Sequence, residues 1–179
     1  MRNSSENSSK RGLPDHALNI PKTLVLGYGN PDREDDGVAW HILKGLAVQF
    51  GLNFPSSYQD EIIQSNENLH LIFDLQLMPE IADELANYSR ICFVDAHTGA
   101  LQEDLNFQKL ESKFQNSPLT HHMTPQTLLA ILDSAYNHNP EAILVSVRGY
   151  QFGFEHNLSP LTRNLAILAI ERISRWIVG

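Results

Sequence analysis

Four carboxylates follow a glycine turn at residues 27–30, which itself ends a short apolar run at 23–26. They come within the next six residues: Asp32, Glu34, Asp35 and Asp36. The turn matches the first part of the glycine-rich motif that binds dinucleotides. However, Asp32 stands where that motif has its third glycine, and the clustered carboxylates would repel a pyrophosphate. Oxygen-rich clusters bind cations instead, so the turn favours metal chemistry. For any single one of these acids, capping of the following helix is the alternative role.

Two further polar positions lie at the ends of predicted elements. Asp95 ends the most apolar run of the chain, while His121 and His122 precede a helix start at 124–125. An acid at a strand end is either a turn former or a site residue at the active edge of a parallel sheet. Together, Asp36, Asp95 and one of the two histidines form an oxygen and nitrogen donor set that suits a borderline transition metal with open positions.

Other candidate nucleophiles and bases are less favourable. No Gly-x-Ser-x-Gly turn occurs, and Ser146 falls inside a predicted strand. Cys92 is the only cysteine and lies in an apolar run, so the sequence predicts neither a disulfide nor a cysteine metal site. His97 follows Asp95 closely and either orients it or is an ordinary polar loop residue.

Strands that alternate with helices must position these residues. Short apolar runs predict four buried strands at 23–26, 69–75, 90–95 and 142–147, and the alternation at 105–110 predicts an edge strand. Helical spacing predicts four helices: one from about 37 to 50, a short one at 79–88, one beginning at Thr124-Pro125, and a last one beginning at Ser159-Pro160. The polar stretch at 51–68 carries no clear pattern. The apolar face of the last helix is predicted to comprise Leu161, Leu165, Leu168, Ile173, Trp176 and Ile177.

This order predicts an α/β fold, in which a single three-layer domain at residues 21–179 has a mostly parallel twisted sheet flanked by helices. Residues 1–20 are rich in Ser and Asn and are predicted to form a flexible polar tail. The chain of 179 residues is long enough for one such domain but hardly for two.

Charge and hydropathy exclude several classes of function. The formal net charge is -8 and no cluster of Lys and Arg occurs, which argues against nucleic-acid binding. No run has the length of a membrane span, and the polar start of the chain lacks the apolar stretch of a signal peptide. We therefore expect a cytoplasmic protein without a membrane partner.

The motifs resemble those of the hydrogenase maturation proteases, the endopeptidases that process nickel-iron hydrogenase large subunits. The similarity extends over roughly residues 22–178 and rests on 24–30, 35–38, 94–96 with Gly99, the loop histidine before an apolar helix, and 147–160. In place of the apolar residues usual after Gly-Asn, this chain has Pro31-Asp32-Arg33-Glu34.

The resemblance implies an aspartic-type endopeptidase that removes the C-terminal extension of a nickel-iron hydrogenase large-subunit precursor after nickel insertion. Asp36 and Asp95 would be the catalytic carboxylates, and the same two residues with His121, or alternatively His122, would sense the metal. The nickel belongs to the precursor, which is the partner, and no tightly bound organic cofactor is implied. Two other classes stay open: a metal-dependent hydrolase of another substrate, and a non-catalytic checkpoint protein for nickel insertion.

Overall fold

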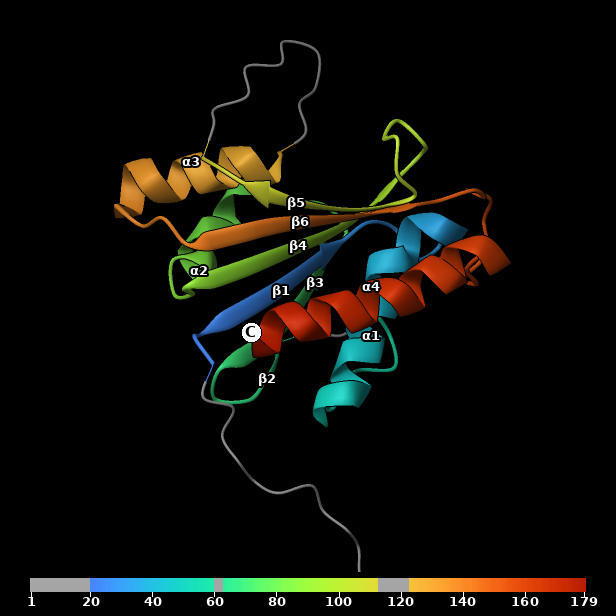
Figure 1. Ribbon diagram of the computed structural model, residues 1–179, viewed down its shortest axis with the longest axis horizontal. Coiled ribbons are helices and arrows are strands. Elements are labelled where there is room, and N and C mark those ends of the chain that lie inside the picture. The colour runs from blue at the N-terminus through green and yellow to red at the C-terminus, as the bar shows by residue number, and fades with distance from the viewer. Residues whose placement is uncertain (1–19, 60–62, 113–122) are drawn as a thin grey trace, which may run out of the picture.

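The computed structural model describes residues 20–59, 63–112 and 123–179, and the side chains of 63–65 are not described (Figure 1). Within these residues the strands are β1 (Thr23–Tyr28), β2 (Ile63–Ser65), β3 (Leu69–Asp74), β4 (Arg90–His97), β5 (Leu105–Leu110) and β6 (Glu141–Arg148). The α-helices are α1 (Val38–Phe50), α2 (Ala82–Leu85), α3 (Pro125–Tyr136) and α4 (Pro160–Val178), and the 3-10 helices are η1 (Glu34–Gly37) and η2 (Pro79–Ile81).

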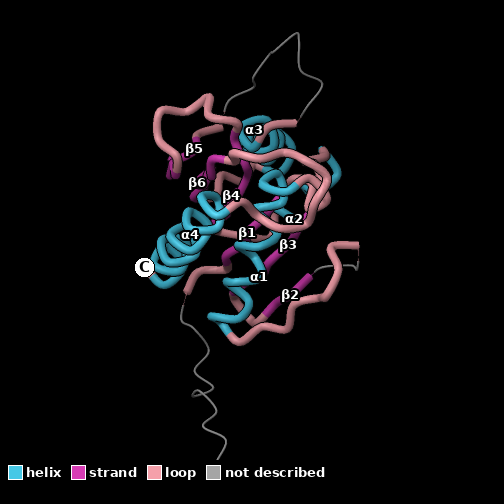
Figure 2. Tube along the Cα trace, turned by 90° about the vertical axis from the view of Figure 1, so that its right-hand side faces the viewer, coloured by secondary structure: helices cyan, strands magenta, loops and turns pink. Residues whose placement is uncertain are grey.

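The strands form one sheet in the order β2-β3-β1-β4-β6-β5. The pairs β1–β3, β1–β4 and β4–β6 are parallel, whereas β2 and β5 are antiparallel edge strands. Helices α1 and α4 cover one face and α2 and α3 the other, which makes three layers (Figures 1 and 2). The prediction of a mostly parallel α/β domain is confirmed. Because β1, β4 and β6 run in parallel, their carboxyl ends meet at one edge of the sheet, where such folds place their sites.

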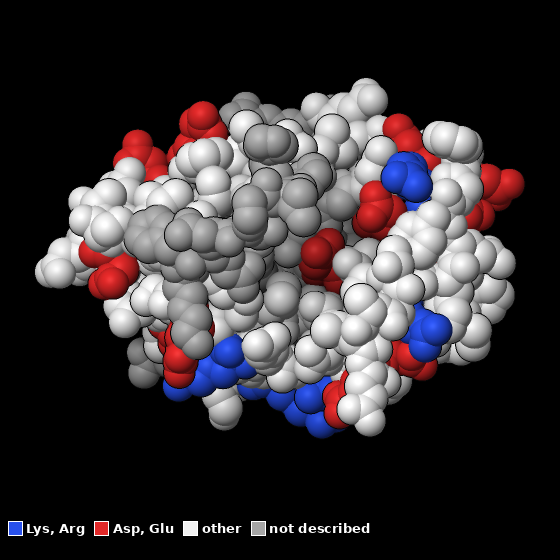
Figure 3. All heavy atoms as spheres, turned by 90° about the horizontal axis from the view of Figure 1, so that it is seen from above, with Lys and Arg blue, Asp and Glu red and all other residues white. Residues whose placement is uncertain are grey.

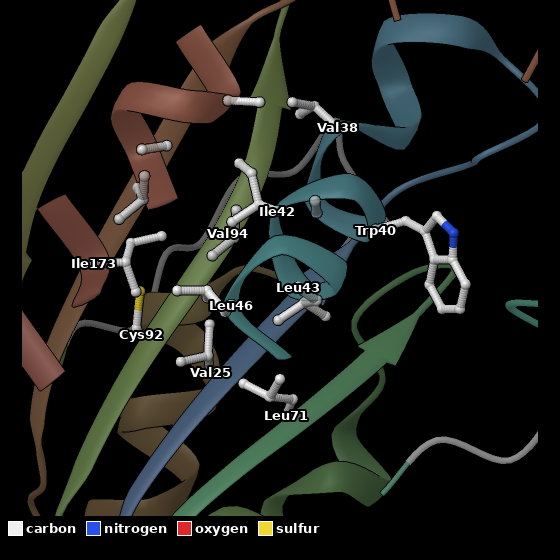
Figure 4. Close-up of a cluster of buried hydrophobic side chains, with 14 of the residues drawn as sticks. Val25, Val38, Trp40, Ile42, Leu43, Leu46, Leu71, Cys92, Val94 and Ile173 are labelled. Atoms are coloured by element: carbon white, nitrogen blue, oxygen red, sulfur yellow. The ribbon is translucent and has the colours of Figure 1, made fainter. Parts of the chain in front are cut away.

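Successive side chains of the central strands enter two separate cores. Val25, Cys92 and Val94 pack with α1 and α4 (Figure 4), while Leu26 and Phe93 pack towards α2 and α3. Burial on both faces explains why these strands read as continuous apolar runs. Burial also raises the pKa of the Cys92 thiol, so this residue packs in the core and does not act as a nucleophile.

Two of the predicted helix caps are confirmed, and one is not. The side chains of Thr124 and Ser159 accept hydrogen bonds from the N–H groups of Thr127 and Thr162, as the Thr-Pro and Ser-Pro pairs predicted. Capping of α1 by Asp35 or Asp36 is wrong, because η1 precedes α1 and the capping residue is Gly37, without a side-chain hydrogen bond.

The buried face of α4 also differs from the prediction. Leu161 and Leu168 are 57% and 49% exposed, and the fully or nearly buried apolar residues are Ala166, Ala169, Ile173 and Ile177. Leu165 and Trp176 are partly buried at its margin. Small residues let α4 approach α1 closely, so the alanines form the contact face and the bulkier leucines point outwards.

The remaining differences concern short elements. The predicted helix at 79–88 is η2 followed by a single turn, α2, and β2 lies in the stretch where no element was predicted. The predicted polar tail lies, apart from Ile20, outside the described residues. No helix in the described part of the chain has the length and apolar character needed to cross a membrane.

Candidate active site

The glycine turn after β1 lets the acidic helix η1 fold back onto the end of the strand. Gly29 has a φ of +136°, and a Cβ atom there would clash with the backbone oxygen of Asp36. The N–H of Asn30 donates a hydrogen bond to Oδ2 of Asp36 at 3.2 Å. The turn therefore holds Asp36 next to the end of β1.

Gly29→Ala should lower the free energy of unfolding by about 3 kcal/mol or more, because an added methyl group combines a clash with strained backbone. The matched control is Gly51→Ala, since Gly51 also has a positive φ, +68°, but no described atom lies within 4 Å of the new Cβ. We expect the control to cost only about 1 kcal/mol. Chemical denaturation of both variants measures the difference, and equal losses would show that the contact with Asp36 does not constrain the turn.

The adjacent acids Asp35 and Asp36 have different roles. Asp35 is fully buried and accepts hydrogen bonds from the N–H groups of Tyr150, Gln151 and Ser159 at 2.7–2.9 Å, and from the Ser159 hydroxyl at 2.7 Å. Burial acts to raise the pKa of Asp35, but these hydrogen bonds outweigh it and hold the pKa below its ordinary value. Asp35 thus joins η1 to the loop after β6, while Asp36 is left partly exposed.

Asp95 lies near the end of β4, next to the end of β1. Its Oδ1 accepts a hydrogen bond from the N–H of Ala96 at 2.8 Å, and its carboxyl group is also hydrogen-bonded to the hydroxyl of Tyr28. Burial raises the pKa of Asp95 to about 7, and the charge of Asp36 adds to this rise, while the two hydrogen bonds oppose it. A carboxyl group with such a pKa exchanges a proton readily at neutral pH, as an acid–base catalyst must.

A groove of about 410 Å³ opens beside Asp95. Its lining is largely apolar, and among the described residues Asp95 is the one charged member: the lining residues are Tyr28, Leu75, Gln76, Leu77, Asp95, Met123, Thr124, Pro125, Gln126 and Leu144. Seen from above, the molecule is hollowed near the middle of this view, and acidic side chains lie in and beside the hollow (Figure 3). The groove offers space for a side chain of a bound peptide next to a titratable carboxyl group.

Comparisons with known proteins agree with this architecture. No protein-family model and no curated protein sequence matches the chain. Solved structures do match, and three of them are the hydrogenase maturating endopeptidase HybD from E. coli (TM-score 0.62, 18% identity, 85% of this chain and 89% of that one), the NiFe hydrogenase maturation protease HycI from Thermococcus kodakarensis (0.62, 17%, 90% and 95%), and HybD from the same archaeon (0.62, 15%, 87% and 99%). The chain has the hydrogenase maturation protease fold. Since at least 85% of each chain is covered, the likeness concerns the whole fold and not one βαβ unit.

Within the hydrogenase maturation protease fold of this chain, Asp36 and Asp95 lie close enough for the charge of one to raise the pKa of the other. His121 and His122, the predicted third position, lie outside the described residues. In the part of the chain that the structure describes, no three His, Cys, Asp or Glu side chains form a group that could hold a metal ion. His97, the last residue of β4, is bonded to the turn that follows it, since its Nδ1 accepts a hydrogen bond from the N–H of Gly99 at 3.2 Å.

Sequence reasoning missed the contribution of Tyr28. The sequence placed this residue only within the glycine turn, yet its hydroxyl reaches Asp95 and its ring lines the groove. The signal that could have found it was its position as the last residue of β1, next to the strand that carries Asp95. Burial raises the pKa of Tyr28 well above its usual range, so its hydroxyl remains a donor at every pH of interest.

Tyr28→Phe should raise the pKa of Asp95 above its present value of about 7, because a hydrogen bond that stabilises the ionised carboxylate is lost. NMR titration of labelled aspartate carboxyl carbons measures this shift directly and needs no substrate. The control is Tyr58→Phe, which removes a hydroxyl that donates to Asp32. An Asp95 titration that moves in neither variant, or equally in both, would contradict the assignment.

Proposed function

We propose that this protein is the endopeptidase that removes the C-terminal extension of a nickel-iron hydrogenase large-subunit precursor once nickel has been inserted. The observation that carries the proposal is the pairing of Asp36 with Asp95 at the carboxyl edge of a hydrogenase maturation protease fold. The raised pKa of Asp95 supports an aspartic type of hydrolysis. We also assign the reaction to the cytoplasm, where the buried Cys92 stays reduced.

In the proposed reaction, the precursor's own nickel ion lies against Asp36, Asp95 and His121, with His122 as the alternative. The precursor segment to be cut then lies in the groove beside Asp95. Asp95 in its ionised form accepts a proton from a water molecule as the oxygen attacks the peptide carbonyl carbon. It returns that proton to the leaving nitrogen when the carbon–nitrogen bond breaks, so the carboxyl group ends as it began.

Nickel would act as the signal that permits cleavage. Without the ion, Asp36 and Asp95 face the precursor without a cation between them, and their uncompensated desolvation opposes docking. With the ion, two carboxylates and one imidazole complete a coordination set that the precursor's ligands leave open. The isolated protein, which lacks the precursor's ligands, should bind free nickel only weakly.

The test compares nickel-loaded and metal-free precursor at equal concentration and follows the mass of the large subunit with time. Cleavage of the nickel-loaded form alone supports the proposal, and equal cleavage of both forms contradicts nickel sensing. Nickel titration of the isolated protein by calorimetry separates the other classes. Tight stoichiometric binding would favour a metal-dependent hydrolase of another substrate, and binding of the precursor without cleavage would favour a checkpoint protein.

A further inference from the structure

The loop between β6 and α4, residues 149–159, is hydrogen-bonded at several points to the acidic helix η1. Asp35 accepts the N–H groups of Tyr150 and Gln151, and its own N–H donates to the backbone oxygen of Gln151 at 3.2 Å. The N–H of Glu34 donates to the backbone oxygen of Glu155 at 2.7 Å, and its carboxylate accepts the N–H of Gly153 at 2.6 Å. The loop and η1 therefore form one continuous surface, which we term the acidic platform.

Glu34 shows that this fastening is strong enough to hold unfavourable backbone. Its φ is +50°, a left-handed value that costs a residue other than glycine energy and persists only where surrounding contacts enforce it. Here both the backbone N–H and the side chain of Glu34 bind the loop. Strain of this kind gathers at binding sites, where a loop must keep one conformation before its partner arrives.

The platform presents one large apolar side chain to solvent. Phe154 is 91% exposed, more than any other large apolar side chain in the described part of the chain. The backbone groups of Gly153 and Glu155, on either side of Phe154, are both hydrogen-bonded to Glu34. The backbone that carries the ring is therefore held in place. A phenylalanine in this position contributes little to the core, and its ring loses the stabilisation that burial of an apolar side chain would give.

We infer that Phe154 is the anchor by which the acidic platform docks a folded protein partner, and that this partner is the large-subunit precursor. The identity of the partner rests on the proposed function. The platform follows the carboxyl ends of β1 and β6, the same edge that holds Asp95, and η1 itself carries Asp36. A partner seated on Phe154 would thus lie at the same edge of the fold as both carboxylates.

The chemistry of the platform also defines the partner's surface. The platform and the residues next to it carry more acidic than basic side chains: Asp32, Glu34 and Glu155 against the exposed Arg33. Asp32 is bonded to Tyr58 and to His156, which lies 3.1 Å from it, so Glu34 and Glu155 next to the anchor decide the local charge. The partner should therefore offer an apolar recess with a neutral or basic rim.

The Phe154 ring is too exposed to lie in a pocket, so a small molecule could make few contacts with it. An anionic lipid surface would be repelled. A protein recess can bury the ring fully, as at interface hot spots.

The experiment measures the steady-state cleavage of nickel-loaded large-subunit precursor from the same organism by wild type, Phe154→Ala and Phe154→Leu. A matched control is Val48→Ala, because Val48 is 76% exposed near the far end of α1. We expect Phe154→Ala to raise KM about tenfold with kcat within about twofold, the pattern of a lost binding contact. Phe154→Leu should recover most of the affinity, and Val48→Ala should change neither constant.

Melting temperatures of all variants should stay close to that of wild type, since neither side chain packs in the core. Wild-type cleavage with an unchanged KM in Phe154→Ala would overturn the docking inference alone. A fall in kcat without a rise in KM would also overturn it. If the wild type neither binds nor cleaves the precursor, the proposed function fails, and the choice of this partner fails with it.

Discussion

Asp95→Asn should reduce cleavage of the nickel-loaded precursor by a factor of about a thousand, within the range expected when a positioned acid–base group is removed. The amide has nearly the same volume as the carboxyl group but cannot accept the proton of the attacking water. Mass spectrometry of the large subunit over time measures the loss. The control is Asp74→Asn, because Asp74 ends β3, which is separated from β4 by β1, at the same edge of the sheet but is exposed. Full activity of Asp95→Asn would refute the catalytic assignment.

The same substitution should stabilise the protein at alkaline pH. Because the pKa of Asp95 is raised to about 7, mainly by burial, the folded state prefers the neutral carboxyl group. The favourable contribution of Asp95 to the free energy of unfolding is therefore present below about pH 4 and is lost as pH rises through about 7. The amide carries no such penalty, so the Asp95→Asn variant should gain about 1–2 kcal/mol over wild type at about pH 8 and little at about pH 5. Melting curves at the two values test the sign.

Asp35→Asn should have the largest effect on stability, a loss of about 3–5 kcal/mol, because a buried carboxylate that accepts three backbone N–H groups is replaced by an amide that also donates. For a chain of this size that loss lowers the melting temperature by about 10 °C. Asp36→Asn is the matched control, since Asp36 is partly exposed. We expect Asp36→Asn to melt close to wild type while it abolishes processing. Similar melting temperatures for the two variants would show that the roles of the adjacent acids are not distinct.

The stabilising effect of Asp35 has the opposite pH dependence to that of Asp95. Its pKa lies below the ordinary value in the folded protein, so its contribution is present above about pH 4 and is lost as pH falls through the folded pKa. The difference in melting temperature between wild type and Asp35→Asn should accordingly be largest near neutrality and should shrink in acid. A difference that grows below about pH 4 would contradict the hydrogen-bonding account.

The layered fold could be predicted because it rests on local patterns. Continuous apolar runs such as 23–26 and 90–95 are characteristic of parallel strands with both faces buried, and Thr-Pro and Ser-Pro pairs begin helices for steric and hydrogen-bonding reasons. The strand β2 could not be predicted, because a short edge strand is defined by its pairing with β3 rather than by its own pattern. The face of α4 was misplaced because alanines were not counted as contact residues, although they permit the closest packing.

The proximity of Asp36 to Asp95 could be predicted from the sequence, but the different environments of Asp35 and Asp36 could not. Asp95 was identified because it ends a strand at the edge where such sheets place their sites. Asp36 was identified because it belongs to the acidic turn and matches the motif of the family that the sequence resembles. Nothing local to the sequence separates Asp35 from Asp36, since the distinction depends on Tyr150, Gln151 and Ser159, more than a hundred residues further along the chain. Tyr28 was missed for the same reason, because its contact with Asp95 crosses between two strands.

The close approach of Gly29 to the backbone oxygen of Asp36 has a consequence for evolution and for redesign of this protein. Between Gly29 and Asp36 the backbone turns back on itself. A residue inserted or deleted between them would therefore place other side chains in the positions that Asp35 and Asp36 now occupy. The length of the interval should therefore stay constant among descendants of this protein while its side chains diverge. Attempts to change partner selectivity are best directed at the solvent-facing side chains of Asp32 and Arg33, with the number of residues left unchanged.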